Sequence, residues 1–292
     1  MGDPEQPNYF RLADRPCRSC RAARRTLNNP PQYASDPKSA GSCRAHCSHL
    51  ACVAVAESRK GGSSLGGNLG PMDRSRIIPA QVRYWDSVAD EKRFSHPLRI
   101  AWLTRHAGPR ARILDFGCGH GRTLAELLRG GYKNVIGIDF SFRMLKCCRS
   151  HLPDVRLVQN DGQTIPLQKH SVDLVLLFAV LTCIPLDEEQ RDLLREISRV
   201  LRPAGLLFIS DLLLNRDLRN LERYDRYAGE YGTYGIFELP EDVVVRHHRK
   251  EWIEELTGSF GQLEFKPFEV RTMNSNKSAA FQYLCRALPS PK

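Results

Sequence analysis

The chain has 292 residues, of which 41% are hydrophobic, enough to bury the core of one α/β domain of ordinary size with further segments added. No apolar run reaches the roughly 18–20 residues that a membrane span requires, and the Met1 end lacks the apolar stretch of a signal peptide. The formal net charge is +10, but no contiguous basic stripe marks a nucleic-acid face. A solvated basic surface is the favoured interpretation of this charge.

Residues 1–71 are expected to be disordered and to end in a Gly/Ser-rich linker. They are rich in Pro, Ser, Arg, Ala and Gly, hold ten Lys/Arg against five Asp/Glu, and have no sustained hydrophobic period. The pairs Cys17/Cys20 and Cys43/Cys47 have spacings compatible with zinc, but the residues between them supply no apolar mini-core. No metal site is therefore predicted, and the abrupt change at Met72 leaves open that translation begins there.

Beyond Met72, helices and strands alternate, which predicts a Rossmann-like, doubly wound and mostly parallel seven-stranded sheet in residues 72–292. Helical spacing over residues 77–106 predicts two helices, with Pro79 and Pro97 in their first turns. Buried strands are predicted at 110–116, 135–139, 155–159, 171–180 and 206–210, and helices at 122–128, 142–151 and 187–200. Residues 202–205 are expected to form the turn into the fifth strand.

After the fifth strand the pattern changes. Residues 211–250 are polar and tyrosine-rich, and we expect them to form a lid on the substrate side. A helix at 251–256 and two alternating segments at 262–270 and 280–287 follow, which predicts an antiparallel strand pair that closes the sheet. A dinucleotide dehydrogenase would more often continue into a further βαβ half.

The most informative stretch follows the first strand. Ile113-Leu114-Asp115-Phe116 leads into Gly117-Cys118-Gly119-His120-Gly121 and then into a helix. Glycines at alternate positions allow backbone N–H groups and a helix N-terminus to approach a ligand closely. Their spacing differs from the dinucleotide fingerprint G-x-G-x-x-G, and the carboxylate of Asp115 suits a cationic ligand group better than a pyrophosphate.

Three acids are expected at the carboxyl ends of successive strands: Asp115, Asp139 and Asp161. Open α/β sheets bind ligands at this edge. A carboxylate that ends the second strand can accept both hydroxyls of a ribose, and the Asp161-Gly162 corner can bond the amino edge of an adenine.

Four segments together resemble the class I S-adenosylmethionine-dependent methyltransferases, of the type 11/25-like kind, over roughly residues 80–287. They are the D-x-G-x-G-x-G stretch at 115–121, Gly137-Ile138-Asp139-Phe140-Ser141 with Met144-Leu145, the segment from Ser171 to Ile184, and Glu196 to Gly205. Where many members have histidine in the third of these segments, this sequence has Cys183, and Pro203-Ala204-Gly205 replaces Pro-Gly-Gly.

This resemblance implies S-adenosyl-L-methionine as cofactor and methyl transfer as the reaction. Carried over residue by residue, the implied cofactor-binding positions are Asp115, Gly117, Cys118, Gly119, Gly121, Asp139, Phe140, Asp161, Gly162 and Phe178. The Tyr84-Trp85-Asp86 segment resembles an aromatic motif that lies over cofactor and substrate. Substrate-side candidates are Tyr84, Tyr231 and His247, and the catalytic residues themselves are not assigned.

The favoured function is methylation of a small-molecule acceptor, mainly by in-line positioning, because the sulfonium already activates the methyl group. A non-catalytic, cofactor-binding scaffold subunit and a methyltransferase acting on protein or RNA remain open alternatives; an NAD-dependent oxidoreductase is disfavoured by the glycine spacing. No membrane partner is expected. Five of the ten cysteines follow residue 72 in apolar settings where a reduced thiol packs as a small hydrophobe, which predicts a reducing, cytoplasmic location.

Overall fold

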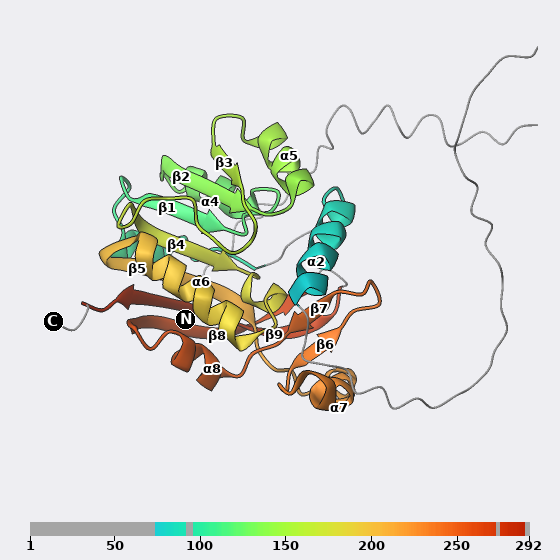
Figure 1. Ribbon diagram of the computed structural model, residues 1–292. Coiled ribbons are helices and arrows are strands. Elements are labelled where there is room, and N and C mark those ends of the chain that lie inside the picture. The colour runs from blue at the N-terminus through green and yellow to red at the C-terminus, as the bar shows by residue number, and fades with distance from the viewer. Residues whose placement is uncertain (1–73, 92–95, 273–274, 290–292) are drawn as a thin grey trace, which may run out of the picture. The chain divides into compact units, whose positions relative to one another are not determined.

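A seven-stranded sheet forms the centre of the computed structural model, which describes residues 74–91, 96–272 and 275–289 (Figure 1). The strand order is β3-β2-β1-β4-β5-β9-β8. The first five strands pair in parallel, and β9 and β8 add to β5 as an antiparallel pair. The predicted Rossmann-like fold with antiparallel C-terminal strands is confirmed. The expectations for residues 1–71 lie outside the described residues.

The elements follow the predicted order. The strands of the sheet are β1 (Arg112–Phe116), β2 (Asn134–Asp139), β3 (Arg156–Gln159), β4 (Val172–Phe178), β5 (Leu201–Leu212), β8 (Phe260–Arg271) and β9 (Lys277–Ala287). The helices are α2 (Arg74–Val88), α3 (Ile100–His106), α4 (Arg122–Arg129), α5 (Phe142–His151), α6 (Asp187–Val200), α7 (Leu218–Tyr231) and α8 (Lys250–Leu256), with a 3-10 turn η2 (Leu181–Cys183) and a hairpin of β6 (Ile236–Glu238) and β7 (Val244–Arg246).

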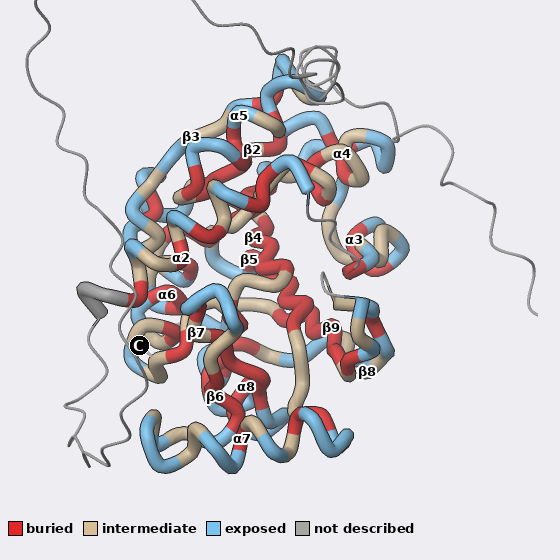
Figure 2. The backbone as a smooth tube through the Cα atoms, turned by 90° about the vertical axis from the view of Figure 1, so that its right-hand side faces the viewer, coloured by how far each residue is buried: buried red, intermediate tan, exposed pale blue. Residues whose placement is uncertain are grey.

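Each face of the sheet has its own hydrophobic core, because successive side chains of a strand point to opposite faces. On β4, Val175 and Leu177 join the core that α6 and α8 cover. Leu174 and Leu176 join the opposite core with residues of α3, α4 and α5. Strands β4, β5 and β9 are therefore buried along most of their length, as Figure 2 shows.

A third, smaller core lies beyond the carboxyl ends of the strands. It joins α2, α7 and the β6–β7 hairpin through Tyr84, Tyr224, Phe237 and Val245, all buried. Residues 211–250 thus contain the end of β5, a helix and a hairpin, packed against α2.

Local signals explain some of the helix boundaries. Ser141 accepts a hydrogen bond from the N–H of Met144 and begins α5, as the sequence predicts. Gly130 ends α4, also as predicted.

Three local predictions were wrong. Pro97 lies before α3 rather than in its first turn, because that helix begins only at Ile100, after Arg99 as N-cap. Pro79 lies inside α2 rather than in its first turn, because the helix begins at Arg74. Residues 202–205 belong to β5 and do not form a turn before it. Val172 of β4 pairs with Leu201, and the next paired residue, Leu174, pairs with Leu206. The residues between Leu201 and Leu206 therefore form a bulge within the strand.

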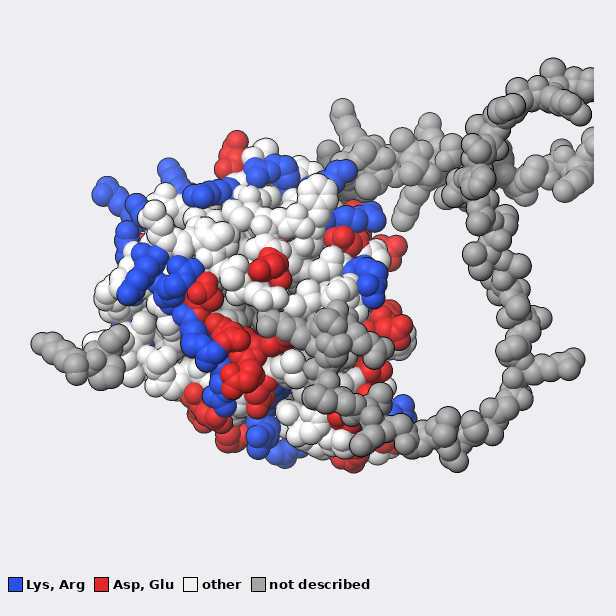
Figure 3. All heavy atoms as spheres, in the orientation of Figure 1, with Lys and Arg blue, Asp and Glu red and all other residues white. Residues whose placement is uncertain are grey.

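Charge is mixed on the face drawn in Figure 3, where acidic and basic side chains lie side by side in the region of α6. Arg191, Arg195 and Arg199 of this helix pair with Glu255, Asp192 and Glu196. Within the described ranges, no helix is long and apolar enough to cross a membrane.

Replacement of Gly121 by alanine tests the packing of the glycine turn. Gly121 has φ +86°, and an added Cβ would meet Cys148 Sγ at 2.4 Å. Gly131 has nearly the same φ, +89°, but nothing within 4 Å of such a Cβ, so it is a matched control. We expect Gly131→Ala to lower the free energy of unfolding by about 1–2 kcal/mol and Gly121→Ala by about 1–3 kcal/mol more. Urea denaturation measures both, and equal losses would contradict the clash.

Candidate active site

A cavity of about 420 Å³ opens at the carboxyl ends of the parallel strands; we call it the first cavity. Eight of the ten predicted cofactor positions line it: Gly117, Cys118, Gly119, Asp139, Phe140, Asp161, Gly162 and Phe178. The remaining two, Asp115 and Gly121, do not. Strand ends that are distant in sequence meet here because parallel strands present their carboxyl ends at one edge.

The glycine turn is tied to the end of β2 by backbone hydrogen bonds. The N–H groups of Gly117 and Cys118 donate to the carbonyl of Ile138 at 2.8 and 3.0 Å. The N–H of Gly119 donates to Asp139 Oδ2 at 2.8 Å, and that of Ser141 donates to Oδ1 at 2.8 Å. Asp139 is therefore fixed in orientation by two N–H donors, and burial raises its pKa to about 6 in spite of them.

Asp115 lies behind this turn and is 1% exposed. Its Oδ2 is buried without a hydrogen-bond partner among the described residues. Burial raises the pKa of Asp115 to about 8, although the positive charge of Arg122 acts in the opposite direction. An unsatisfied buried carboxyl is costly, so the site carries an acceptor that a cationic or hydrogen-bond-donating ligand would satisfy.

Gly121 has a packing role in the structure. Because Gly121 has no Cβ, the turn can lie directly against Cys148 of α5. This packing accounts for the glycine, and no contact with a ligand is needed to explain it.

Asp161 and Gly162 form a tight corner after β3. Asp161 Oδ1 accepts the N–H groups of Gln163 and Thr164 at 2.8 and 2.9 Å, and Gly162 has φ +76°. Partial burial opposes ionisation, but these N–H donors lower the pKa of Asp161, so this carboxylate is ionised at neutral pH.

A further strand-end acid, Asp211, holds the loop after β4. It is fully buried at the end of β5 and accepts the N–H groups of Thr182 and Leu212 at 3.2 and 2.7 Å. Burial raises its pKa to about 7. The sequence prediction placed Asp211 in the lid because the fifth strand was expected to end at Ser210, two residues before its observed end at Leu212.

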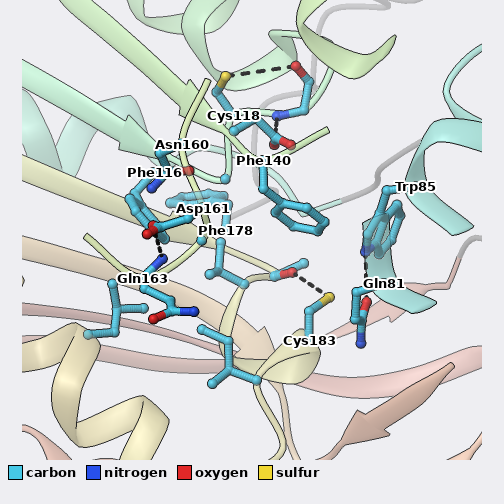
Figure 4. Close-up of a pocket in the computed structure, with 18 of the residues that line it drawn as sticks. Gln81, Trp85, Phe116, Cys118, Phe140, Asn160, Asp161, Gln163, Phe178 and Cys183 are labelled. Atoms are coloured by element: carbon cyan, nitrogen blue, oxygen red, sulfur yellow. Dashed lines mark hydrogen bonds between the residues drawn. The ribbon is translucent and has the colours of Figure 1, made fainter. Parts of the chain in front are cut away.

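Helix α2 forms another wall of the first cavity. Gln81 and Trp85 line it, and the indole N–H of Trp85 donates to Gln81 Oε1 at 3.0 Å. In Figure 4 these two residues lie across the cavity from Asn160, Asp161 and Gln163. The helix is held in place by Ser141, whose hydroxyl donates to the carboxylate of Asp86 at 2.6 Å.

A smaller cavity of about 120 Å³ adjoins the first; we call it the second cavity. Trp85, His96, Ala179 and Cys183 line both. Two predicted substrate-side residues, Tyr84 and His247, line the second cavity.

His96 and Cys183 are the titratable side chains on the shared wall. His96 is buried, and its Nδ1 lies 2.9 Å from the hydroxyl of Ser210. Burial, followed by the charge of Arg122, lowers the pKa of His96 to about 3, so the ring is neutral at pH 7. Burial and the nearby Asp211 raise the pKa of the Cys183 thiol, which therefore stays protonated.

The structure separates the third substrate-side candidate from both cavities. The hydroxyl of Tyr231 donates to Glu238 of β6, which ties the end of α7 to the hairpin. Sequence reasoning missed His96, Asn160 and Arg122, which line the first cavity. Arg122 directly follows the last glycine of the turn, which was an available signal; His96 has no neighbouring motif. Within the described ranges, no group of three or more His, Cys, Asp or Glu is arranged to hold a metal ion.

Comparisons with known proteins agree with this geometry. Residues 114–209 match the family model of the methyltransferase domain. A SAM-dependent methyltransferase from Methanosarcina mazei superposes with a TM-score of 0.60 at 22% identity, covering 64% of this chain and 97% of that one. Another from Anabaena variabilis gives 0.53 at 16% identity, covering 77% and 100%. The chain therefore has the fold of the class I S-adenosylmethionine-dependent methyltransferases, and residues 114–209 are similar to the methyltransferase domain family.

Curated relatives match about half of the chain. A ubiquinone biosynthesis O-methyltransferase from Acinetobacter baylyi is 24% identical over 155 residues, which is 51% of this chain and 65% of the relative. A protein of the same name from Aeromonas salmonicida is 31% identical over 46% of this chain and 58% of the relative. A phthiotriol/phenolphthiotriol dimycocerosates methyltransferase from Mycobacterium ulcerans is 32% identical over 38% and 41%. The matches thus span less than two thirds of these relatives' length.

The buried carboxyl of Asp115 predicts a pH-dependent stability difference. Its pKa is about 8 in the folded chain, against 3.8 as the ordinary value, so the folded state keeps a proton that the unfolded state loses. The retained proton therefore contributes to the free energy of unfolding at low pH. This contribution is lost as the pH rises toward 8, at up to about 1.4 kcal/mol per pH unit. Relative to the native chain, we expect Asp115→Asn to gain free energy of unfolding between pH 5 and 8. Urea denaturation at several pH values measures this, and a constant difference between the two proteins would contradict it.

Proposed function

We propose that this protein is a methyltransferase that uses S-adenosylmethionine to methylate a small-molecule acceptor. The observation that carries the proposal is the pair of adjoining cavities: the first is lined by the glycine turn and two of the strand-end acids, and the second shares a wall with it. Transfer between two ligands requires that they meet at a common boundary with water excluded. Trp85, Ala179 and Cys183 supply such a boundary.

The residues of the first cavity, together with Asp115 buried beside it, fit S-adenosylmethionine. The buried, unpartnered Oδ2 of Asp115 lies behind the glycine turn, where it would accept from the ammonium of a methionine moiety, directly or through water. Asp139, fixed by two N–H donors, would accept from the ribose hydroxyls. Asp161 and the ring of Phe140 would border the adenine, and Phe178 the methionine arm. When bound, the cofactor supplies a methyl group activated by a sulfonium.

His96 is the side chain that we assign to proton removal. Methyl transfer from a bound cofactor would leave the carbon–sulfur electron pair on sulfur and an acceptor oxygen positively charged. The proton of that oxygen would be strongly acidic, so even a weakly basic neutral imidazole such as that of His96 could take it. His96 is neutral and lies on the shared wall, whereas burial keeps the Cys183 thiol protonated.

A scaffold role, or action on protein or RNA, lacks a comparable supporting observation in the described part of the chain. We also propose that the protein works in the cytoplasm. Cys118, Cys147, Cys148, Cys183 and Cys285 are free thiols, as a reducing compartment would keep them.

Binding measurements on the full chain test the cofactor assignment. We expect isothermal titration calorimetry to detect S-adenosylmethionine and S-adenosylhomocysteine at micromolar dissociation constants. Asp139→Ala should weaken both by at least about tenfold, since it removes two charge-assisted hydrogen bonds. Asp154→Ala, which changes an exposed acid outside both cavities, should leave the constants unchanged. Binding of NAD instead would overturn the assignment.

Substitution of His96 tests the proton step. With an oxygen acceptor identified by screening, we expect His96→Gln to lower kcat by about 100-fold or more, the usual contribution of a general base. The dissociation constant of S-adenosylhomocysteine should change little. Cys183→Ser on the same wall is the control and should retain kcat within a few fold. Equal effects of the two substitutions would refute the role of His96.

A further inference from the structure

Among the described residues, the second cavity is lined by three arginines and by no acidic side chain. Arg219, Arg223 and Arg271 contribute to its wall. The two histidines there do not add to the charge, because burial lowers the pKa of His96 to about 3 and that of His247 far below its ordinary value. The lining is thus strongly positive, and a confined positive site concentrates anions.

Two of these arginines face the cavity from one helix. Arg219 and Arg223 are four residues apart on α7, so they lie on the same helical face. Like charges at this spacing repel each other, and the charge of Arg219 contributes to a lowered pKa of Arg223, after burial as the main cause. Arg219 is partly balanced by Asp217, with 3.8 Å between Nε and Oδ1. Arg271, the last residue of β8, donates to the carbonyl of Ser275 in the loop that follows.

Arg223 lacks a charge partner in the described part of the chain. It forms no ion pair there within 4.0 Å, and its Nε is buried without a hydrogen-bond partner, although a side-chain hydrogen bond with Tyr224 and the more distant charge of Asp217 partly stabilise it. Its guanidinium lies 3.5 Å from the centre of the Phe237 ring, which fixes its position but does not neutralise its charge. A desolvated guanidinium without an anion is unfavourable, and its planar fork suits a carboxylate.

The rest of the second cavity suits an apolar or aromatic body. Phe237 and Trp85 contribute ring surface, and the buried hydroxyl of Tyr84 has no hydrogen-bond partner among the described residues. Glu241 acts electrostatically on Tyr84 but does not line the cavity. A ligand about the size of one ring, with a polar group for Tyr84, would satisfy both features.

We propose that the acceptor is a small, ring-sized molecule with a carboxylate, and that Arg223, assisted by Arg219, holds this carboxylate in the second cavity. This inference rests on the proposed function, in which the second cavity is the acceptor site. The carboxylate sits at the α7 side, so the opposite end of the acceptor is directed to the wall that holds His96 and Cys183.

Matched acid and amide probes test the proposal. Calorimetry on the full chain saturated with S-adenosylhomocysteine compares benzoate, 4-hydroxybenzoate and phenylacetate with benzamide, 4-hydroxybenzamide and phenylacetamide. We expect at least one acid to bind about tenfold or more tightly than its amide. Arg223→Met, which keeps the packing on Phe237, should remove this preference, and Arg223→Lys should keep part of it. A charge-assisted hydrogen bond typically contributes about 1.5–3 kcal/mol, which corresponds to about 10- to 150-fold.

Arg226→Met is the matched control, because Arg226 is exposed on the same helix and lines neither cavity. It should leave all constants unchanged, and thermal melting verifies that the variants are folded. The inference is overturned if no acid binds better than its amide, if Arg223→Met keeps the preference, or if phenyl phosphate binds more tightly than every acid. Failure of S-adenosylhomocysteine to bind the native chain would instead overturn the proposed function, and the inference with it.

Discussion

The link between the glycine turn and the end of β2 is the constraint on which the first cavity depends. Two N–H groups of the turn donate to the carbonyl of Ile138, and a third donates to the carboxylate of Asp139. These bonds use the backbone itself, so they fix the turn without a side chain that would fill the cavity. The same carboxylate accepts the N–H of Ser141, which begins α5 and in turn holds α2 through Asp86. Asp139 therefore links the ends of β1 and β2 to α5 and, through Ser141, to α2, the helix that forms a wall of the first cavity.

Helix α2 explains why the two cavities adjoin. Trp85 and Tyr84 are neighbours on α2, yet Trp85 lines both cavities and Tyr84 only the second. Gln81 of the same helix donates to the carbonyl of Val244 at 2.8 Å, which joins α2 to the hairpin of residues 211–250. The segment expected as a lid is thus anchored to the element that covers the cofactor side. Movement of one would be coupled to the other through this contact.

The sheet and the first cavity were predictable from sequence because their signals are local. A buried strand followed by an acid, as at Asp115 and Asp139, fixes both the element and its place at the sheet edge. The second cavity was only partly predictable, since its members come from seven separate segments between Tyr84 and Ser278. His96 follows no motif, and Arg223 resembles any arginine of an amphipathic helix until α7 is placed against α2. Tyr231 shows the reverse: a tyrosine near glycines predicts a lid residue, but its hydroxyl bonds to Glu238 and stabilises the hairpin. Side-chain direction, which sequence does not give, decides these cases.

Charge is distributed in opposite senses on the two sides of the shared wall. Five acidic side chains line the first cavity against two arginines, Arg122 and Arg195, and Asp115 is buried behind the turn, whereas the second cavity is lined by arginines. The wall between them is neutral, because Cys183 keeps its proton and His96 is uncharged. A cationic cofactor and an anionic acceptor would each be attracted to its own side, and each would be repelled from the other. Such an arrangement would place the two ligands correctly before their reacting atoms come into contact. The shared wall would carry no fixed charge at the point where the sulfonium loses its positive charge during transfer.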